Sequence, residues 1–157
     1  MLFDIPRHRH DQWAQGWLYA EGHPEWRSPR TRIWYSINAM AWGLVELEPE
    51  VADWLESLPT ANFATVAFYI DLLADQGPLL SEPYTRQLDG RLRELRLHLN
   101  RQAMRISYWI APGRRIVLMT VFTKSSRQAP REIQRAKRAL ARCIAEEHMT
   151  DKDENND

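Results

Sequence analysis

Three cations in the second half of the chain are placed where they could act together on a phosphate. Arg96 and Arg105 each take an outward position in a segment of alternating apolar residues, and Lys124 follows a third such segment. Antiparallel pairing would bring Arg96 and Arg105 to one open sheet face, because alternate side chains share a face. Arginine forks hold phosphate oxygens and neutralise charge at phosphorus, so these cations suit phosphodiester chemistry. The alternatives are ion pairs with Asp89 and Glu94, or a basic surface that binds no phosphate.

A second group of cations recurs at helical spacing near the C-terminus. The positions i, i+4, i+7 and i+11 hold Arg131, Arg135, Arg138 and Arg142. Apolar residues occupy the other side of this segment, so the stripe of arginines faces solvent or a partner. We expect no acid to form ion pairs with the stripe, which favours RNA or ribosome binding over a solvated charged face.

Two further residues are candidates for proton transfer. His98 shares a strand face with Arg96, and Tyr108 lies on the next strand segment. Either could act as a general base. The alternatives are that Tyr108, which alternates with apolar residues, belongs to the core and that His98 is an incidental polar residue. His8 and His10 have no third ligand nearby, so we expect no metal site.

Length and composition limit the class of protein. The chain has 157 residues and 18.5 kDa, with 44% hydrophobic residues, 27% charged residues and a mean hydropathy of −0.55, which indicates one domain. We expect no membrane span and no secretion signal, hence a cytoplasmic protein. A single cysteine, Cys143, excludes an internal disulfide. No motif of a serine hydrolase, an NTPase or a zinc protease is present, and we expect no cofactor.

The zero net charge hides a strong segregation of charge along the chain. Residues 40–85 contain eight acids and no Lys or Arg, whereas residues 86–142 contain fifteen Lys or Arg and three acids. The second block therefore carries a net charge of +12. Such a block suggests contact with a polyanion, most commonly nucleic acid. The alternative is that the charges intermix on the folded surface.

Apolar periodicity predicts an α+β fold in the order β-α-α-β-β-β-α. Pro49 opens the first helix, Thr60 is expected to cap the second, and the two form a hairpin. Period-two patterns predict a strand at 41–47 and three strands at 92–99, 104–110 and 115–123, the last of which is central because both its faces are apolar. Pro130 opens a final helix. We expect a domain over residues 40–148, an N-terminal extension over 1–39 that is poorly ordered or outside the functional domain, and an acidic disordered tail over 149–157.

Several short stretches resemble the phage-derived, HigB-like branch of the RelE/ParE toxin superfamily. They are LRELR at 92–96, RISY at 105–108, RIVL at 115–118, FTK at 122–124 and PREIQRA at 130–136. The resemblance covers roughly residues 41–146. It implies a RelE-like fold, with an antiparallel-rich sheet packed on a helical hairpin and a C-terminal helix. It also implies a toxin of a type II toxin–antitoxin system, an endoribonuclease that cleaves mRNA on the ribosome and is silenced by a cognate DNA-binding, HigA-like antitoxin.

The resemblance assigns catalytic roles to Arg96, Arg105 and Lys124. It implies a metal-independent reaction, in which a ribose 2′-hydroxyl attacks the adjacent phosphate. Ser125 stands where the family commonly has a second lysine, and Thr120 where it often has a histidine. Two alternatives stay open: a ParE-like inhibitor of a protein target such as gyrase, and an inactive relic that only binds the antitoxin.

Overall fold

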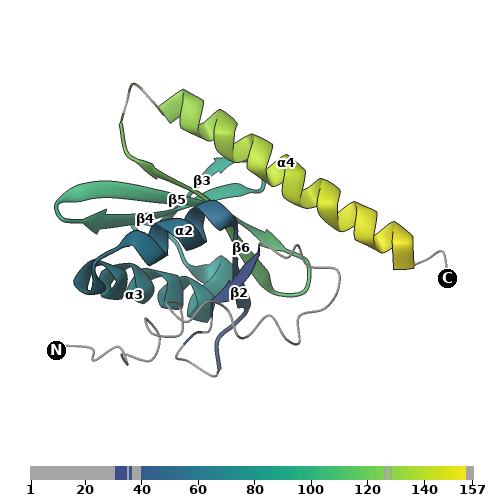
Figure 1. The fold of residues 1–157 in the computed structure, drawn as a ribbon, viewed down its shortest axis with the longest axis horizontal. Helices are drawn as coiled ribbons and strands as arrows, with labels where there is room; N and C mark the ends of the chain where they lie inside the picture. The colour runs from purple at the N-terminus through teal and green to yellow at the C-terminus, as the bar shows by residue number, and fades with distance from the viewer. Residues whose placement is uncertain (1–30, 35, 37–39, 126, 128, 155–157) are drawn as a thin grey trace.

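The computed structural model describes residues 31–34, 36, 40–125, 127 and 129–154, with side chains described as far as Glu147. These residues form six strands, three α-helices and one 3-10 turn (Figure 1). In chain order they are β1 (Arg32–Trp34), β2 (Leu44–Leu47), α2 (Pro49–Ser57), α3 (Thr60–Gln76), η1 (Gly77–Leu79), β3 (Thr85–Asp89), β4 (Leu92–Leu99), β5 (Gln102–Ala111), β6 (Arg115–Thr123) and α4 (Ala129–Glu154).

The strands form one mixed sheet in the order β1-β2-β6-β5-β4-β3. Strands β2 and β6 are parallel, and the other neighbours are antiparallel. The predicted α+β class and C-terminal helix are confirmed, and β6 lies inside the sheet between β2 and β5. The sequence prediction missed the two edge strands, β1 and β3. Both are short, and β3 is largely exposed, so neither has the apolar alternation that identified the other strands.

The helical hairpin covers one face of the sheet. Helices α2 and α3 bury one side each, because their apolar residues recur at helical spacing. The larger core cluster joins these helices to β4, β5 and β6, and its members include Val51, Leu55, Phe63, Ile70, Leu73, Leu95, Leu97, Ile106, Ile116 and Leu118. The odd-numbered leucines of β4 therefore point to the hairpin, and its even-numbered residues point to the other face.

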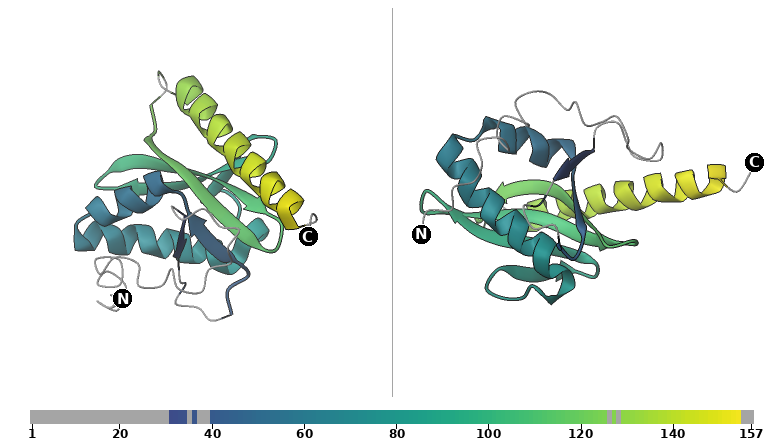
Figure 2. Two further views of the ribbon diagram at one scale, coloured as in Figure 1. Left: turned by 45° about the vertical axis from the view of Figure 1, so that its right-hand side comes forward. Right: turned by 90° about the horizontal axis from the view of Figure 1, so that it is seen from below.

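Helix α4 crosses the opposite face of the sheet (Figures 1 and 2). Its Ala136, Ala139 and Cys143 pack in a second cluster that includes Leu92 and Trp109. Leu92 and Trp109 lie at the β3–β4 turn end of their strands. The described residues of the second cluster therefore do not extend to the part of this sheet face nearest the β4–β5 turn.

Strand β1 ties part of the predicted extension to the domain. Its backbone pairs with β2, and Trp34 is 1% exposed. The Trp34 indole donates a hydrogen bond of 2.9 Å to Asp71, and its ring lies 5.7 Å from that of Phe63. Residues 32–34 thus belong to the sheet, although the sequence placed the domain boundary at Met40. At the other end, α4 continues to Glu154, six residues into the predicted tail.

The helix boundaries follow local chemistry with one exception. Pro49 occupies the first turn of α2, as predicted, where its missing N–H costs no hydrogen bond. Thr60 is the first residue of α3 rather than its cap, because Pro59 holds the capping position and no side chain caps the helix. Helix α3 ends at Gln76, and Gly77 caps it with a φ of 53°, which favours glycine. A Cβ there would lie 2.3 Å from the Trp42 ring, so a side chain would also collide.

Candidate active site

Arg96 and Arg105 lie directly opposite each other on β4 and β5, as the alternation of the sequence predicts. Their neighbours Leu95, Leu97 and Ile106 belong to the hairpin core, so both arginines lie on the face that α4 partly covers. The side chain of Arg96 is 25% exposed and that of Arg105 only 5%. A ligand in solution would therefore meet Arg96 first, with Arg105 beneath the surface.

Lys124 and a further arginine, Arg86, extend this group across four neighbouring strands. Lys124 follows β6 and is exposed, and its backbone N–H bonds the Ala103 carbonyl at 2.8 Å. Arg86 on β3 is exposed and pairs in register with Glu94 of β4. We call Arg86, Arg96, Arg105 and Lys124 the cationic floor. It spans three strand spacings, or ~14 Å, which exceeds the size of one phosphate group.

Sequence reasoning missed Arg86 because it missed β3. A signal was present, however. Asp89, the last residue of β3, pairs with Leu92 of β4, so Gly90 and Arg91 form a two-residue turn, and glycine at the first position of such a turn is typical of tight hairpins. Gly90 has a φ of 56°, as such turns require.

A carboxylate lies among the cations of the floor. One oxygen of Glu94 is 3.6 Å from Nε of Arg105 and 3.7 Å from Nε of Arg96. Burial raises the pKa of Glu94, although Arg105, Arg96, Arg86 and Lys124 all act to lower it. Burial also disfavours the charged form of Arg105 and therefore lowers its pKa, whereas the negative charge of Glu94 acts to raise it. The predicted alternative of an ion pair with Glu94 is therefore present, but it leaves Arg96 partly exposed.

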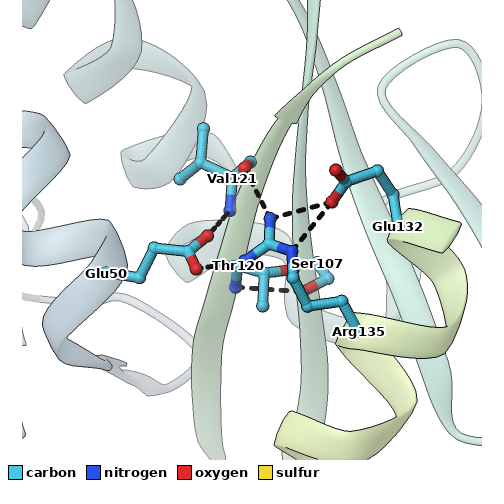
Figure 3. Close-up of polar contacts among 6 residues, drawn as sticks. All are labelled: Glu50, Ser107, Thr120, Val121, Glu132 and Arg135. Carbon is cyan, nitrogen blue, oxygen red and sulfur yellow. Dashed lines mark hydrogen bonds and ion pairs between the residues drawn. The ribbon is translucent and has the colours of Figure 1, made fainter. Parts of the chain in front are cut away.

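A pair of buried hydroxyls continues the row of Glu94 toward β6. Ser107 lies opposite Glu94, and Thr120 lies opposite Ser107. The two hydroxyl oxygens are 2.5 Å apart, and the Thr120 backbone N–H also donates to the Ser107 oxygen at 3.0 Å (Figure 3). A β-bulge beside this pair gives β6 one extra residue, Met119. Thr120 is thus held inside the sheet, at the position where the resembled family often has a histidine.

The two proton-transfer candidates have different positions. His98 is exposed and lies on the same sheet face as Arg96, two residues further along β4 toward the β4–β5 turn. Tyr108 is fully buried in the hairpin core, on the opposite face. Its hydroxyl accepts a hydrogen bond of 3.2 Å from Nε of Arg93. The structure therefore does not bring Tyr108 to Arg96 and Arg105.

The stripe of arginines on α4 divides into two parts. Arg131, Arg138 and Arg142 are exposed, whereas Arg135 is held in a network of polar contacts. Arg135 pairs with Glu132, three residues before it, so the expectation that no acid pairs with the stripe is wrong. Such a pair forms because residues three apart are neighbours on a helix surface.

Arg135 links α4 to the first turn of α2 and to β6 (Figure 3). It pairs with Glu50, and its Nη2 donates to the Val121 carbonyl at 3.0 Å. Glu50 in turn accepts the Val121 N–H at 2.6 Å. Strand β2 pairs with β6 only as far as Leu118, so the β6 backbone at Val121 needs other hydrogen-bond partners. The side chains of Arg135 and Glu50 supply them.

The family comparison covers the whole floor. Residues 53–141, more than half of the chain, match the family described as phage-derived protein Gp49-like (DUF891). The chain belongs to this Gp49-like family. It is a RelE-like toxin family of toxin–antitoxin systems, and such toxins act with an antitoxin partner. No curated protein matches the chain.

Two negative findings concern only the part of the chain that the structure describes. None of its helices has the length and apolar character that crossing a membrane requires. No three His, Cys, Asp or Glu side chains in that part gather where they could hold a metal ion. His8 and His10 lie outside the described residues.

Proposed function

We propose that this Gp49-like protein is the toxin of a type II toxin–antitoxin system and cleaves mRNA on the ribosome, as HigB-like toxins do. The observation that carries the proposal is the cationic floor. Four cations from four neighbouring strand regions share one sheet face, within the segment that matches a RelE-like toxin family. A phosphodiester is the ligand that such a floor suits best, because arginines and lysine complement its negative charge.

In the proposed reaction a ribose 2′-hydroxyl attacks the adjacent phosphate. Arg96 is exposed enough to hold a non-bridging phosphate oxygen directly. Arg105 lies deeper and adds positive charge beneath the phosphorus, where negative charge grows in the transition state. Lys124 orients the phosphate or supplies a proton to the leaving oxygen. Arg86 extends the contact to a neighbouring phosphate of the RNA.

The exposed arginines of α4 supply a second contact surface in this proposal. Arg131, Arg138 and Arg142 would bind the RNA backbone or the ribosome, whereas Arg135 serves to fix the helix. A cognate DNA-binding, HigA-like antitoxin would silence the toxin by covering the floor. Complementary negative charge on that partner would favour such a complex.

Growth after induction tests the proposal. The full chain is expected to arrest bacterial growth, and Arg96→Ala or Lys124→Ala is expected to relieve the arrest. Arg91→Ala is the matched control, because Arg91 is an exposed arginine at the β3–β4 turn, outside the floor. Arrest that persists in both floor variants would refute the proposed site.

A second assay separates this function from the ParE-like alternative. Purified protein is added to a DNA supercoiling reaction with gyrase and, in parallel, to a translating extract. The proposal expects inhibition of translation and normal supercoiling. Blocked supercoiling with intact mRNA would instead identify a non-enzymatic inhibitor. If neither assay shows an effect but the antitoxin still binds, the chain is an inactive relic.

A further inference from the structure

The cationic floor contains a buried carboxylate that the proposed roles do not use. Glu94 is 7% exposed, and one of its carboxylate oxygens lies close to both Arg96 and Arg105. Its distances to the two Nε atoms, 3.7 and 3.6 Å, are longer than a hydrogen bond. Glu94 is therefore close enough to feel both charges, yet neither arginine donates a short hydrogen bond to it. A carboxylate in this state keeps its lone pairs available for a proton donor.

The proposed reaction still needs a group that accepts the proton of the 2′-hydroxyl. Tyr108 cannot supply it, because its side chain is buried on the other face of the sheet. His98 is on the correct face, but it lies beyond Arg96 toward the β4–β5 turn and is exposed. Glu94 lies next to both arginines that would hold the phosphate. The atom that attacks phosphorus is bound to the same ribose as that phosphate, so its proton must be taken close to those arginines.

We propose that the Glu94 carboxylate is the general base of the RNA cleavage reaction. This inference rests on the proposed function. Arg96 is partly exposed and turns outward to the incoming phosphate, which opens the carboxylate to the neighbouring 2′-hydroxyl. Arg105 stays buried and keeps the carboxylate in place. Glu94 thus separates from Arg96 only when a substrate phosphate takes over the pairing with that arginine.

The chemical step balances without any oxidant or reductant. The 2′-oxygen forms a bond to phosphorus, and its proton passes to Glu94. The bond from phosphorus to the 5′-oxygen breaks, and that oxygen keeps the electron pair and takes a proton from the Lys124 ammonium. The products are an RNA end with a 2′,3′-cyclic phosphate and an RNA end with a 5′-hydroxyl. Exchange with water returns both side chains to their starting states.

The charged groups around Glu94 define the expected pH dependence. Arg86 faces it from β3, Arg96 from its own strand, Arg105 from β5, and Lys124 from the end of β6. These four groups favour the ionised carboxylate and so lower the pKa of Glu94, while burial favours the protonated form and raises that pKa. The cleavage rate of the wild-type protein is therefore expected to rise with pH through a single acidic limb, which reports the ionisation of Glu94.

The test compares Glu94→Gln with the wild-type full chain on programmed ribosomes. Single-turnover cleavage is measured with normal mRNA, and affinity is measured with mRNA that carries one 2′-deoxy nucleotide at the cut position and so cannot react. We expect cleavage to slow by about 10²–10⁴-fold, the usual contribution of a general base. Affinity is expected to stay equal or to tighten, because the substitution removes a negative charge from the floor. The acidic limb should disappear.

The control is Asp89→Asn, which removes a carboxylate that pairs with Lys137 at the sheet edge. It should cleave like the wild type. Cleavage by Glu94→Gln within threefold of the wild type would overturn the inference, as would parallel losses of affinity and cleavage, which indicate that Glu94 only positions the arginines. If Glu94→Gln does not fold, the wild-type pH profile decides: a flat profile from acidic to neutral pH overturns the inference. A folded wild-type protein that cuts no mRNA refutes the proposed function itself, and this inference with it.

Discussion

Replacement of Trp34 by alanine tests whether β1 is part of the folded unit. Trp34 is 1% exposed and contacts Phe63, and its indole donates to Asp71 of α3. These contacts connect the N-terminal strand to the hairpin, 37 residues further along the chain. If they stabilise the domain as the structure indicates, Trp34→Ala must lower the free energy of unfolding substantially.

The size of the effect follows from two contributions. Truncating a buried tryptophan to alanine typically costs about 3–5 kcal/mol, because it leaves a cavity and loses apolar burial. A hydrogen bond to a charged acceptor contributes about 1.5–3 kcal/mol, and that contribution is partly included in the first figure. We therefore expect a loss of about 3–5 kcal/mol, which is a large part of the usual ~5–15 kcal/mol stability of a domain. At roughly 2–4 °C per kcal/mol, the melting temperature should fall by about 6–20 °C.

Urea unfolding followed by circular dichroism measures this loss. Trp34→Phe is the graded variant, because it keeps an aromatic ring and loses the indole hydrogen bond, and it should lose about 1–3 kcal/mol. Leu79→Ala is the control, since Leu79 is 82% exposed and its truncation should change stability by less than ~0.5 kcal/mol. A loss below ~1 kcal/mol in Trp34→Ala would refute the assignment of β1 to the domain and support a boundary at Met40.

Three further predictions concern α4 and its contacts. Arg135→Ala should lower the free energy of unfolding by about 1–2 kcal/mol, because it removes charge-assisted bonds to Glu50 and Val121. The exposed control Arg131→Ala should change the free energy of unfolding little, and urea unfolding of both variants checks this. Burial and nearby Glu48 raise the pKa of the Cys143 thiol, so a maleimide should label it at pH 8 only as fast as the protein opens; rapid labelling of the native state would contradict this. Burial also raises the pKa of Glu48 above its ordinary 4.5, so its ionisation disfavours folding at neutral pH. Glu48→Gln should therefore be more stable than the wild type at pH 7, by about 1.4 kcal/mol per pKa unit, with the gain vanishing as the pH falls below 4.5; a difference that does not change with pH would refute this.

The elements with strong periodicity could be predicted from the sequence, and the edges of the sheet could not. Strand β6 was bounded correctly because both its faces are apolar, and α2 because Pro49 marks its start. Strand β1 has three residues, too few to show a period of two. Its place in the sheet depends on burial of Trp34 against α3, a contact between distant segments that local patterns do not encode.

Strong periodicity also allowed part of the candidate site to be predicted. Alternation placed Arg96 opposite Arg105 correctly, since a two-residue period fixes the face of each side chain. It did not reveal that Arg105 would be nearly buried, and it left the ion pairs with Glu94 as one of several alternatives. Helical spacing also grouped Arg135 with the exposed arginines. In the structure β2 pairs with β6 only as far as Leu118, and Arg135 bonds the β6 backbone beyond that point, at Val121.

Primer extension on a reporter mRNA in a translating extract tests the central claim most directly. The full chain and its Arg96→Ala variant are added at equal concentrations, after both have been shown to be folded. The account predicts discrete cuts within codons for the wild type and their loss in the variant. Intact mRNA with the folded wild-type protein, or the same cuts with Arg96→Ala, would contradict the claim that the cationic floor cleaves RNA.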